Sequence, residues 1–175
     1  MKINKENRKR ILLISDDFRS TSGVANVSRD IIINTCQHYN WFQLAGAVNH
    51  PDKGKIIDIS EEINKELKID DSNVKVLGVD GYGDPQLIRH LIKNENIDAI
   101  FLITDPRYFT FLFQIENEIR KKIPIFYLNI WDELPAPLYN LPFYQSCDGL
   151  FAISKQTLNI NKLVLEQGQS KYQVI

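Results

Sequence analysis

The chain has 175 residues, of which 43% are apolar and 25% are charged, and its formal net charge is −1. This length and apolar content suffice for one well-cored domain, and the small net charge excludes a broad basic surface for nucleic acid or an anionic membrane. No apolar run approaches the ~20 residues that a membrane span requires. We therefore expect a cytoplasmic domain with no nucleic-acid partner and no membrane span.

A basic lead-in of residues 1–9 precedes the domain, which we expect to occupy residues 10–175. The apolar run that follows the lead-in, residues 11–14, is too short for the core of a secretory signal. We expect the lead-in charges to lie in solvent. They belong to Lys2, Lys5, Arg8 and Lys9, with Arg10 directly after them.

Cysteine and histidine positions give no sign of a metal site. Cys36 and Cys147 lie far apart in apolar contexts, which predicts buried thiols rather than a disulfide framework or a zinc site. The histidines share no metal-ligand spacing with one another or with a cysteine. We expect no metal.

A buried strand, a polar loop and an amphipathic helix open the domain. Ser22 is the expected N-cap of the helix, which should end near residue 40. Gly23 lacks a Cβ, so a phosphate could closely approach the free amides of the first helical turn. The alternative is an ordinary first turn of a parallel sheet that binds nothing. The apolar face of the helix is expected to hold Val24, Val27, Ile31 and Thr35 or Cys36.

Strands and helices alternate along the rest of the chain, which predicts a mainly parallel sheet with helices on both faces. Strands are expected at 41–48, 55–59, 74–79, 98–104, 123–129 and 149–153, and another begins at 174–175. Helices are expected at 60–67, after Asp84-Pro85, after Asp105-Pro106, and from Ser154 to Gly168. In such sheets, ligands lie beyond the carboxyl ends of the strands.

Two loops at those carboxyl ends carry candidate ligand-binding side chains. The glycines around Tyr82 are expected to lift its ring over the sheet edge to cover a ligand, although a simple tight turn is the alternative. In the segment after 123–129, Trp131 offers an apolar face to a sugar ring, and Asp132 offers a carboxylate for a sugar hydroxyl. At most one of the adjacent acids Asp132 and Glu133 should face the ligand. The alternative for both acids is to complement a helix dipole.

Three common active-site motifs are missing from the sequence. No Gly-x-Gly-x-x-Gly follows the first strand, which disfavours a dinucleotide-binding fold of the usual kind. The chain also lacks the ATPase phosphate loop and the Gly-x-Ser-x-Gly elbow of serine hydrolases.

Four segments, taken in order and spacing, carry a family resemblance that extends over nearly the whole chain from residue 10. They are Ser22-Gly23-Val24-Ala25 before a long helix, Gly81-Tyr82-Gly83-Asp84-Pro85, Asp98-Ala99-Ile100 with Asp105-Pro106 after it, and Asp148-Gly149-Leu150-Phe151-Ala152-Ile153-Ser154. Together they resemble the amino-terminal half of a GT-B glycosyltransferase of the family 4 type. The resemblance implies a Rossmann-like, three-layer α/β/α domain, which is one half of the GT-B fold.

The resemblance further implies a retaining, metal-independent transfer of a sugar from a nucleoside diphosphate sugar to an acceptor hydroxyl, with no cofactor. The acceptor would be a sugar, a glycan or a lipid. By resemblance, Ser22 and Gly23 would bind the donor diphosphate, Asp132 is the catalytic candidate, and the acceptor would contact Tyr82, Asp105 and Trp131. The C-terminal donor-binding domain of such enzymes is absent from this chain, so the isolated chain should be inactive until that domain, or a separate subunit, is supplied.

A stand-alone, doubly wound binding or regulatory module is the alternative. Asp16-Asp17 after the first strand suggests a receiver-type module, but its phosphoacceptor aspartate and lysine are not evident at later strand ends. An exposed apolar patch at the carboxyl edge of the sheet would favour a domain that packs against a partner lobe, whereas a polar rim would favour the stand-alone module.

Overall fold

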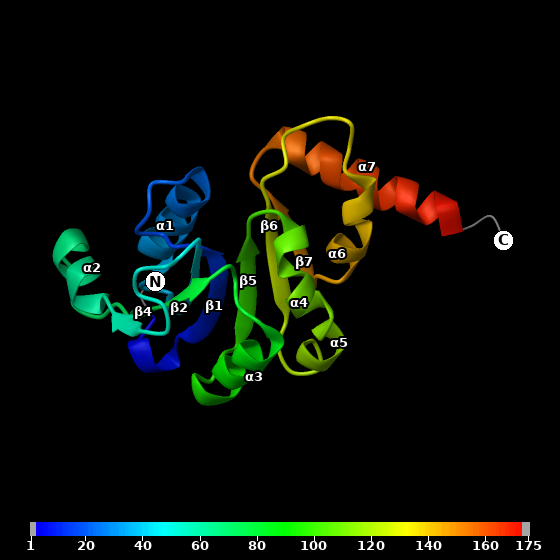
Figure 1. Ribbon diagram of the computed structural model, residues 1–175. Helices are drawn as coiled ribbons and strands as arrows, with labels where there is room; N and C mark the ends of the chain where they lie inside the picture. Colours follow the sequence, from blue (N-terminus) through cyan, green and yellow to red (C-terminus); the bar gives the residue numbers. More distant parts are fainter. Residues whose placement is uncertain (1–2, 173–175) are drawn as a thin grey trace.

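The computed structural model describes residues 3–172, with side chains described to residue 167, and contains a seven-stranded sheet between helical layers (Figure 1). The strand order is β3-β4-β2-β1-β5-β6-β7, and every neighbouring pair is parallel except β3 and β4. This confirms the predicted Rossmann-like α/β/α architecture. The strands are β1 Lys9–Asp16, β2 Tyr39–Ala47, β3 Ile56–Asp58, β4 Val74–Asp80, β5 Ala99–Ile103, β6 Ile125–Asn129 and β7 Gly149–Ala152.

Helices cover both faces of the sheet. None of those within residues 3–172 is long and apolar enough to cross a membrane. The α-helices are α1 Gly23–Thr35, α2 Ser60–Leu67, α3 Pro85–Asn94, α4 Thr110–Phe113, α5 Glu116–Ile119, α6 Leu141–Gln145 and α7 Lys155–Tyr172. Short 3-10 turns occur at η1 Lys5–Asn7, η2 Pro106–Phe109 and η3 Leu138–Asn140.

The strand order reverses at β1. From β1 the chain adds β2 and β4 on one side, and α3 then leads to β5 on the other side of β1. The carboxyl ends of β1 and β5 therefore form the topological switch point, where the crevice of a doubly wound sheet binds its ligand.

The predicted helix starts are confirmed by their caps. The side chains of Ser22, Asp84 and Asp105 accept hydrogen bonds from the first backbone N–H groups of α1, α3 and η2. Ser154 accepts one from the Thr157 N–H (3.1 Å) at the start of α7. Each bond satisfies a donor that the helix itself leaves unpaired.

The predicted helix ends of α1 and α7 are wrong. Helix α1 stops at Thr35, because β2 already begins at Tyr39. Its predicted face is confirmed in part, because Cys36 is buried and Val24, Val27 and Ile31 pack against the core, but the fully buried positions of the helix are Ala25, Ser28 and Ile32. Helix α7 continues through Gly168 to Tyr172. The strand predicted at 174–175 lies outside the described residues.

The single helix predicted after Asp105-Pro106 is instead divided into η2, α4 and α5. Non-helical backbone at Phe109 (φ −99°, ψ 16°) and Ile115 (φ −114°, ψ 13°) interrupts it. Phe109, Leu112 and Ile119 are nevertheless buried in one apolar core, so the apolar pattern located the buried side chains but not the breaks.

The basic lead-in is not wholly solvated as predicted. Arg8 is only 5% exposed, and its guanidinium donates to the carbonyl oxygens of Cys36 (3.0 Å) and Asp71 (2.7 Å) and to the Asp71 carboxylate. A buried charge needs such a partner. The lead-in is therefore joined to the domain.

The predicted burial of the thiols is confirmed for Cys36 and holds in part for Cys147, which is half-buried; neither forms a disulfide. Burial raises the pKa of Cys36 and raises that of Cys147 to about 12. Both thiols are therefore protonated and unreactive at neutral pH.

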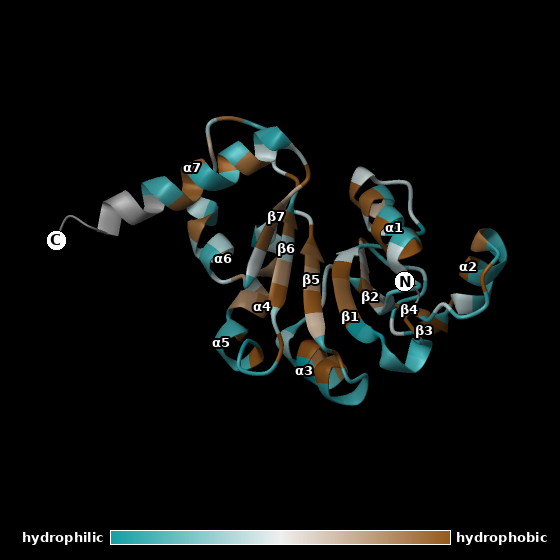
Figure 2. Cartoon of the chain, turned by 180° about the vertical axis from the view of Figure 1, so that it is seen from behind, coloured by the Kyte–Doolittle hydropathy of each residue, from teal (hydrophilic) through white to brown (hydrophobic). Residues whose placement is uncertain are grey.

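The two faces of the sheet are covered unequally. Helices α3 to α7 pack on one face, but on the other the core beneath α1 and α2 is formed by β1, β2, β4 and Ile103 at the end of β5. Figure 2 shows β5, β6 and β7 with no helix in front of them. Phe101 and Phe126 on this face are half-buried and Phe151 is 50% exposed, and together with α1 they border an apolar groove of about 320 Å³.

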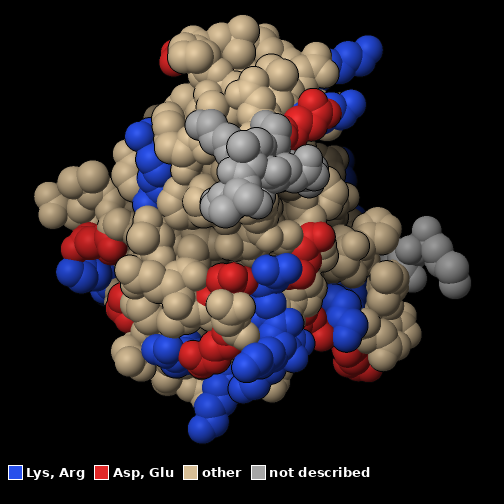
Figure 3. Space-filling view, turned by 90° about the vertical axis from the view of Figure 1, so that its right-hand side faces the viewer, with Lys and Arg blue, Asp and Glu red and all other residues tan. Residues whose placement is uncertain are grey.

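Charged side chains of both signs are mixed on the surface. On the face seen in Figure 3, blue and red side chains lie next to one another over the half away from the carboxyl edge, and most of the remaining surface is uncharged. This distribution offers no continuous basic patch on that face, in keeping with the net charge of −1.

Candidate functional site

Asp16, at the end of β1, connects the first loop to the Gly81-Tyr82-Gly83 loop. Its Oδ1 atom accepts a hydrogen bond from the Tyr82 hydroxyl (2.6 Å), and its Oδ2 atom accepts one from the Ser22 hydroxyl (2.6 Å). Burial and the nearby Asp16 carboxylate raise the pKa of Tyr82, so its phenol remains a donor at neutral pH. One carboxylate thus holds both loops in place.

Tyr82 does not lift over the sheet edge as predicted. Gly81 (φ +67°) and Gly83 (φ +104°) adopt left-handed backbone that favours glycine, but they turn the ring inward. The ring lies against Gly46 of β2, where an added Cβ would come within 2.6 Å of it. Tyr82 therefore forms a wall of the site rather than a cover.

A cavity of about 530 Å³, which we call the central cavity, opens beside Tyr82 at the topological switch point. Its polar groups include the half-buried Asp16, and the exposed side chains of Val48 and Tyr108 border it. The lining residues are Asp16, Ser20, Gly46, Ala47, Val48, Gly81, Tyr82, Thr104 and Tyr108.

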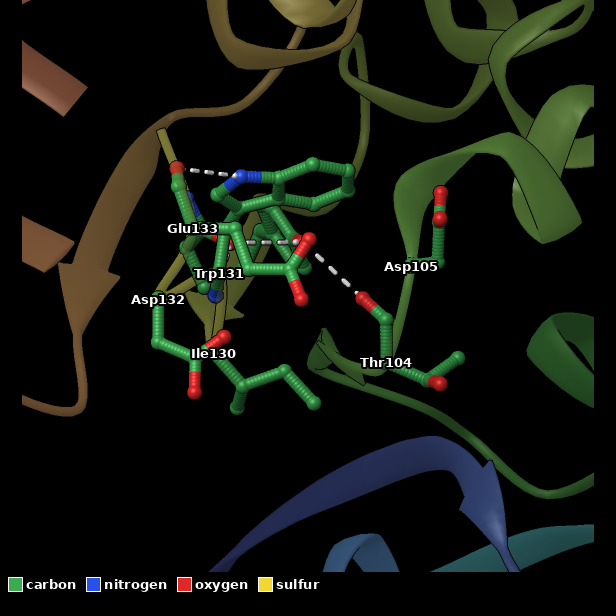
Figure 4. Close-up of a pocket in the computed structure, with 8 residues that line it drawn as sticks. Thr104, Asp105, Ile130, Trp131, Asp132 and Glu133 are labelled. Atoms are coloured by element: carbon green, nitrogen blue, oxygen red, sulfur yellow. Dashed lines mark hydrogen bonds between the residues drawn. The ribbon is translucent and has the colours of Figure 1, made fainter. Parts of the chain in front are cut away.

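A second cavity of about 220 Å³, the lateral cavity, lies beyond the ends of β5 and β6 (Figure 4). In Figure 4 the indole ring of Trp131 extends toward the Asp105 side, and the Asp132 carboxyl group leaves the backbone on the other side. The indole N–H donates to the Glu133 carbonyl oxygen (2.9 Å), which fixes the ring. The lining residues are Thr104, Asp105, Tyr127, Asn129, Ile130, Trp131, Asp132 and Glu133.

Arg107 neutralises Asp105 beside the lateral cavity. Its Nε and Nη2 atoms donate to the two carboxylate oxygens (2.9 and 2.5 Å), and its guanidinium lies 5.4 Å from the Tyr139 ring centroid and 6.0 Å from that of Trp131. Burial alone would raise the pKa of Asp105, but the hydrogen bonds and charge of Arg107 outweigh it and lower that pKa. Asp105 is therefore an ion-paired carboxylate that orients Arg107.

A buried polar network supports the floor of the lateral cavity. The Tyr127 hydroxyl donates to the Thr104 carbonyl oxygen (2.9 Å), and the Asn129 amide donates to the Tyr144 hydroxyl (2.7 Å) and to Asn161 (2.5 Å). Burial raises the pKa of both tyrosines. These hydrogen bonds connect β6 to α6 and α7 beneath the cavity.

Thr104 borders both cavities and has strained backbone. Its φ of +130° is rare for a β-branched residue, and its side chain is nearly buried. Such strain persists only where the surrounding structure imposes it, and it clusters at functional sites.

Asp17 has a structural role. Its carboxylate accepts hydrogen bonds from the Arg19 guanidinium (2.7 Å) and from His50 Nε2 (3.0 Å), while His50 Nδ1 accepts from the Asp52 N–H (3.0 Å). Burial acts to raise the pKa of Asp17, but Arg19 and His50 together lower it. The Asp17 carboxylate is thus engaged by Arg19 and His50 within the protein.

The predicted site residues lie along one edge of the sheet but in different places. Asp105, Trp131 and Asp132 meet in the lateral cavity, and Tyr82 lines the central one. Ser22 and Gly23 line neither cavity, although they begin α1, which follows β1 at the same edge. The Ser22 hydroxyl is engaged by Asp16 and by the Ala25 N–H (3.0 Å).

Sequence reasoning missed the roles of four residues: Asp16, Thr104, Arg107 and Tyr108. Asp16 and Arg107 did fall within loops predicted to follow a strand. The only available signal for Thr104 was its place at the end of the strand predicted at 98–104. Its backbone angle and its position between two cavities cannot be read from the local sequence.

Large exposed apolar side chains surround these cavities. Val48 is 92% exposed and Tyr108 62% exposed. Exposed polar side chains such as Arg19, Asp132 and Lys155 lie at the same edge, where other exposed apolar side chains follow β6 and β7. These apolar residues are Leu134, Leu138, Tyr139 and Ile153.

Comparison with protein-family models, with curated proteins and with solved structures finds no match to this chain. Among residues 3–172, no group of three or more His, Cys, Asp or Glu side chains is placed to hold a metal ion. Fold and site together define a doubly wound α/β domain with one cavity at its switch point and a second cavity beyond the ends of β5 and β6.

Proposed function

We propose that this chain is the acceptor-side domain of a retaining glycosyltransferase of the GT-B type, which acts together with a donor-binding lobe. The observation that supports this most directly is the lateral cavity, where the fixed indole of Trp131 and the exposed carboxylate of Asp132 lie at the edge where doubly wound sheets bind ligands. An aromatic face suits the C–H face of a sugar ring, and a carboxylate accepts hydrogen bonds from hydroxyls.

In this proposal Asp132 is the catalytic candidate, because it accepts a hydrogen bond from the attacking acceptor hydroxyl and orients it. Trp131 holds the acceptor ring, and Asp105 acts through Arg107, which it fixes against Trp131 and Tyr139. The roles of Trp131 and Asp105 are thus positioning roles.

The first loop contributes to the donor diphosphate through its backbone. An added Cβ at Gly23 would meet no atom within 4 Å, so internal packing does not require glycine there, and a ligand can approach the amides of the first turn. The Ser22 hydroxyl is occupied and the Asp16 carboxylate is adjacent. Most of the diphosphate charge must therefore be stabilised by cations of the donor-binding lobe.

Exposed apolar side chains at the carboxyl edge, Val48 and Leu134 among them, support a domain that packs against such a lobe. Clusters of such side chains mark interaction surfaces, whereas a fully polar rim would favour a stand-alone module. With one wall of the cleft alone, water is not excluded and the donor is not clamped. The chain by itself is therefore inactive in this proposal.

Titrations of the purified chain test the proposal. Uncharged sugars should quench or shift the fluorescence of Trp131, since the other tryptophan, Trp41, is buried. Nucleoside diphosphate sugars should bind no tighter than about 1 mM, or about −4 kcal/mol. Replacement of the exposed Asp132 by Ala keeps Trp131 as the reporter, and it should weaken the sugar response and leave the thermal midpoint nearly unchanged.

Two results would contradict the proposal. One is micromolar binding or turnover of a nucleoside diphosphate sugar by the chain alone. The other is phosphorylation of Asp16 or Asp17 by acetyl phosphate without any response to sugars, which would support a receiver-type module.

A further inference from the structure

The central and lateral cavities adjoin one another along a single short segment. Thr104 lines both. The next residues divide between them, because Arg107 lies against Trp131 of the lateral cavity and Tyr108 lies against Tyr82 of the central cavity, with ring centroids 5.5 Å apart. The two cavities are therefore neighbours along the segment that follows β5.

Each cavity combines an aromatic side chain with a carboxylate. Tyr108 and Asp16 supply them in the central cavity, and Trp131 and Asp132 supply them in the lateral cavity. An aromatic face and a nearby hydrogen-bond acceptor suit a ring with C–H groups on its faces and hydroxyl groups at its edge. The two cavities thus offer the same combination of an aromatic side chain and a carboxylate.

The charges near the cavities disfavour an anionic ligand. Neither cavity is lined by lysine or arginine. Arg107 is paired with Asp105, and Arg19 is paired with Asp17 and Asp52. Within the described chain, by contrast, Asp16, Asp132 and Glu133 form no ion pair, so a phosphate or carboxylate on the ligand would meet like charge.

We propose that the acceptor is an uncharged oligosaccharide and that two consecutive sugar rings occupy the two cavities, one ring in each. This inference rests on the proposed function and deepens it, since it specifies the length and charge of the acceptor. Thr104, which lines both cavities, then lies next to the glycosidic linkage between the two rings.

A titration series with the full chain tests this arrangement. The probes are glucose, galactose and mannose, the α- and β-linked disaccharides built from them, and the 6-phosphates of the same sugars, followed by amide chemical shifts in NMR spectra. The best disaccharide should bind about tenfold more tightly than either of its monosaccharides, because the second ring binds without a further loss of translational freedom. The phosphates should bind more weakly than the uncharged sugars.

Variants separate the two cavities. Trp131→Leu should remove the advantage of the disaccharide while monosaccharide shifts persist near Tyr108. Tyr108→Ala should also remove that advantage, while monosaccharide shifts persist near Trp131. Tyr39→Ala, at an exposed tyrosine remote from the carboxyl edge, is the matched control and should change neither. Thermal unfolding of each variant checks that it is folded, and Tyr108 is exposed enough for its replacement to be tolerated.

The outcomes distinguish this inference from the proposed function. Equal affinity for mono- and disaccharides, tighter binding of the phosphates, or tighter binding of octyl glucoside than of any disaccharide would overturn the two-ring inference and leave the glycosyltransferase proposal standing. Absence of any sugar response would overturn both.

Discussion

Thr104 has a backbone conformation that its own side chain disfavours and that the surrounding structure imposes. Its carbonyl oxygen accepts the Tyr127 hydroxyl, and its backbone is held at a φ of +130° between two cavities. A β-branched side chain resists this conformation, whereas glycine adopts it freely. The neighbouring contacts therefore compensate for local strain of about 1–3 kcal/mol.

Replacement of Thr104 by Gly and by Ala measures that strain. Glycine is normally less favourable than alanine by about 0.5–1 kcal/mol, but here we expect Thr104→Gly to be more stable than Thr104→Ala by about 1–2 kcal/mol, because only glycine relieves the strain. Urea unfolding of both variants gives the difference. The usual order, with alanine more stable, would show that the backbone relaxes at no cost.

The Tyr82 hydroxyl is a second group whose contribution to stability can be measured by a single replacement. Replacement of Tyr82 by Phe removes the hydrogen bond to Asp16 and keeps the ring against Gly46. We expect a loss of about 1.5–3 kcal/mol in the free energy of unfolding, the range for hydrogen bonds to charged groups. Tyr108→Phe, on an exposed side chain, is the control and should change stability by less than about 0.5 kcal/mol.

Between elements, the end of β2 depends on the absence of a side chain at Gly46. A Cβ there would collide with the Gly81 carbonyl oxygen and with the Tyr82 ring. The backbone of the Gly81-Tyr82-Gly83 loop can therefore lie directly on β2, which brings Tyr82 within reach of Asp16 on the adjacent strand β1.

Two glycine replacements compare this contact with an open position. Gly46→Ala should lower the urea midpoint strongly, by the equivalent of several kcal/mol, because overpacking against backbone typically costs about 1–3 kcal/mol and the Asp16 hydrogen bond is lost as well. Gly23→Ala meets only open space and should leave the midpoint nearly unchanged. A similar response of both variants would contradict the packing described at Gly46.

The elements that the sequence predicted well are those with local causes. Ser22, Asp84-Pro85 and Asp105-Pro106 marked helix starts because their side chains bond to amides two or three residues away. The alternating pattern of strands and helices likewise led to the parallel sheet. The inward turn of Tyr82 depends on Gly46 and Asp16, which are distant in sequence, so no local pattern could reveal it.

In the candidate site, too, the sequence predicted which loops come together but not the contacts between residues that are distant in sequence. The carboxyl-edge rule placed the loops of Asp105, Trp131 and Asp132 at one edge of the sheet, and the pairing of β5 with β6 in the structure brings these residues to one cavity. It could not show that Asp105 is neutralised by Arg107 or that Thr104 borders a second cavity, since both depend on side-chain and backbone geometry.

At the scale of the whole molecule, carboxylates join the amino ends of strands. Asp98 accepts hydrogen bonds from the Lys9 ammonium and the Arg10 N–H (both 2.8 Å), and Asp148 accepts from the Ile125 N–H (2.8 Å) and from Arg120. Burial acts to raise the pKa of both acids, but these hydrogen bonds and charges outweigh it and lower the pKa.

The free energy of unfolding should consequently decrease at low pH. Because these carboxyl groups have a lower pKa in the folded state than in the unfolded state, the unfolded chain binds more protons below about pH 4. The contribution is fully present above the unfolded pKa and is lost as the pH falls through the folded pKa. Urea midpoints from pH 7 to pH 2.5 should be flat above about pH 5 and then decline.

The variant Asp98→Asn tests how much of the loss of stability in acid comes from the titration of Asp98. The amide oxygen still accepts from the Arg10 N–H, but the group no longer titrates. The decline below about pH 4 should therefore be shallower than in the parent chain. An unchanged slope would mean that Asp98 has the same pKa in both states.

The unequal helical cover of the sheet has a practical consequence for anyone who handles the protein. Phe101, Phe126 and Phe151 leave an aromatic strip in contact with water, and anilinonaphthalene sulfonate fluoresces on such surfaces. The native chain should brighten this dye without any denaturant, and Phe151→Thr should dim the emission while Ile56→Thr, at another exposed strand residue, should not. A bright signal, usually taken as a mark of loosened packing, would then come from a fully ordered fold.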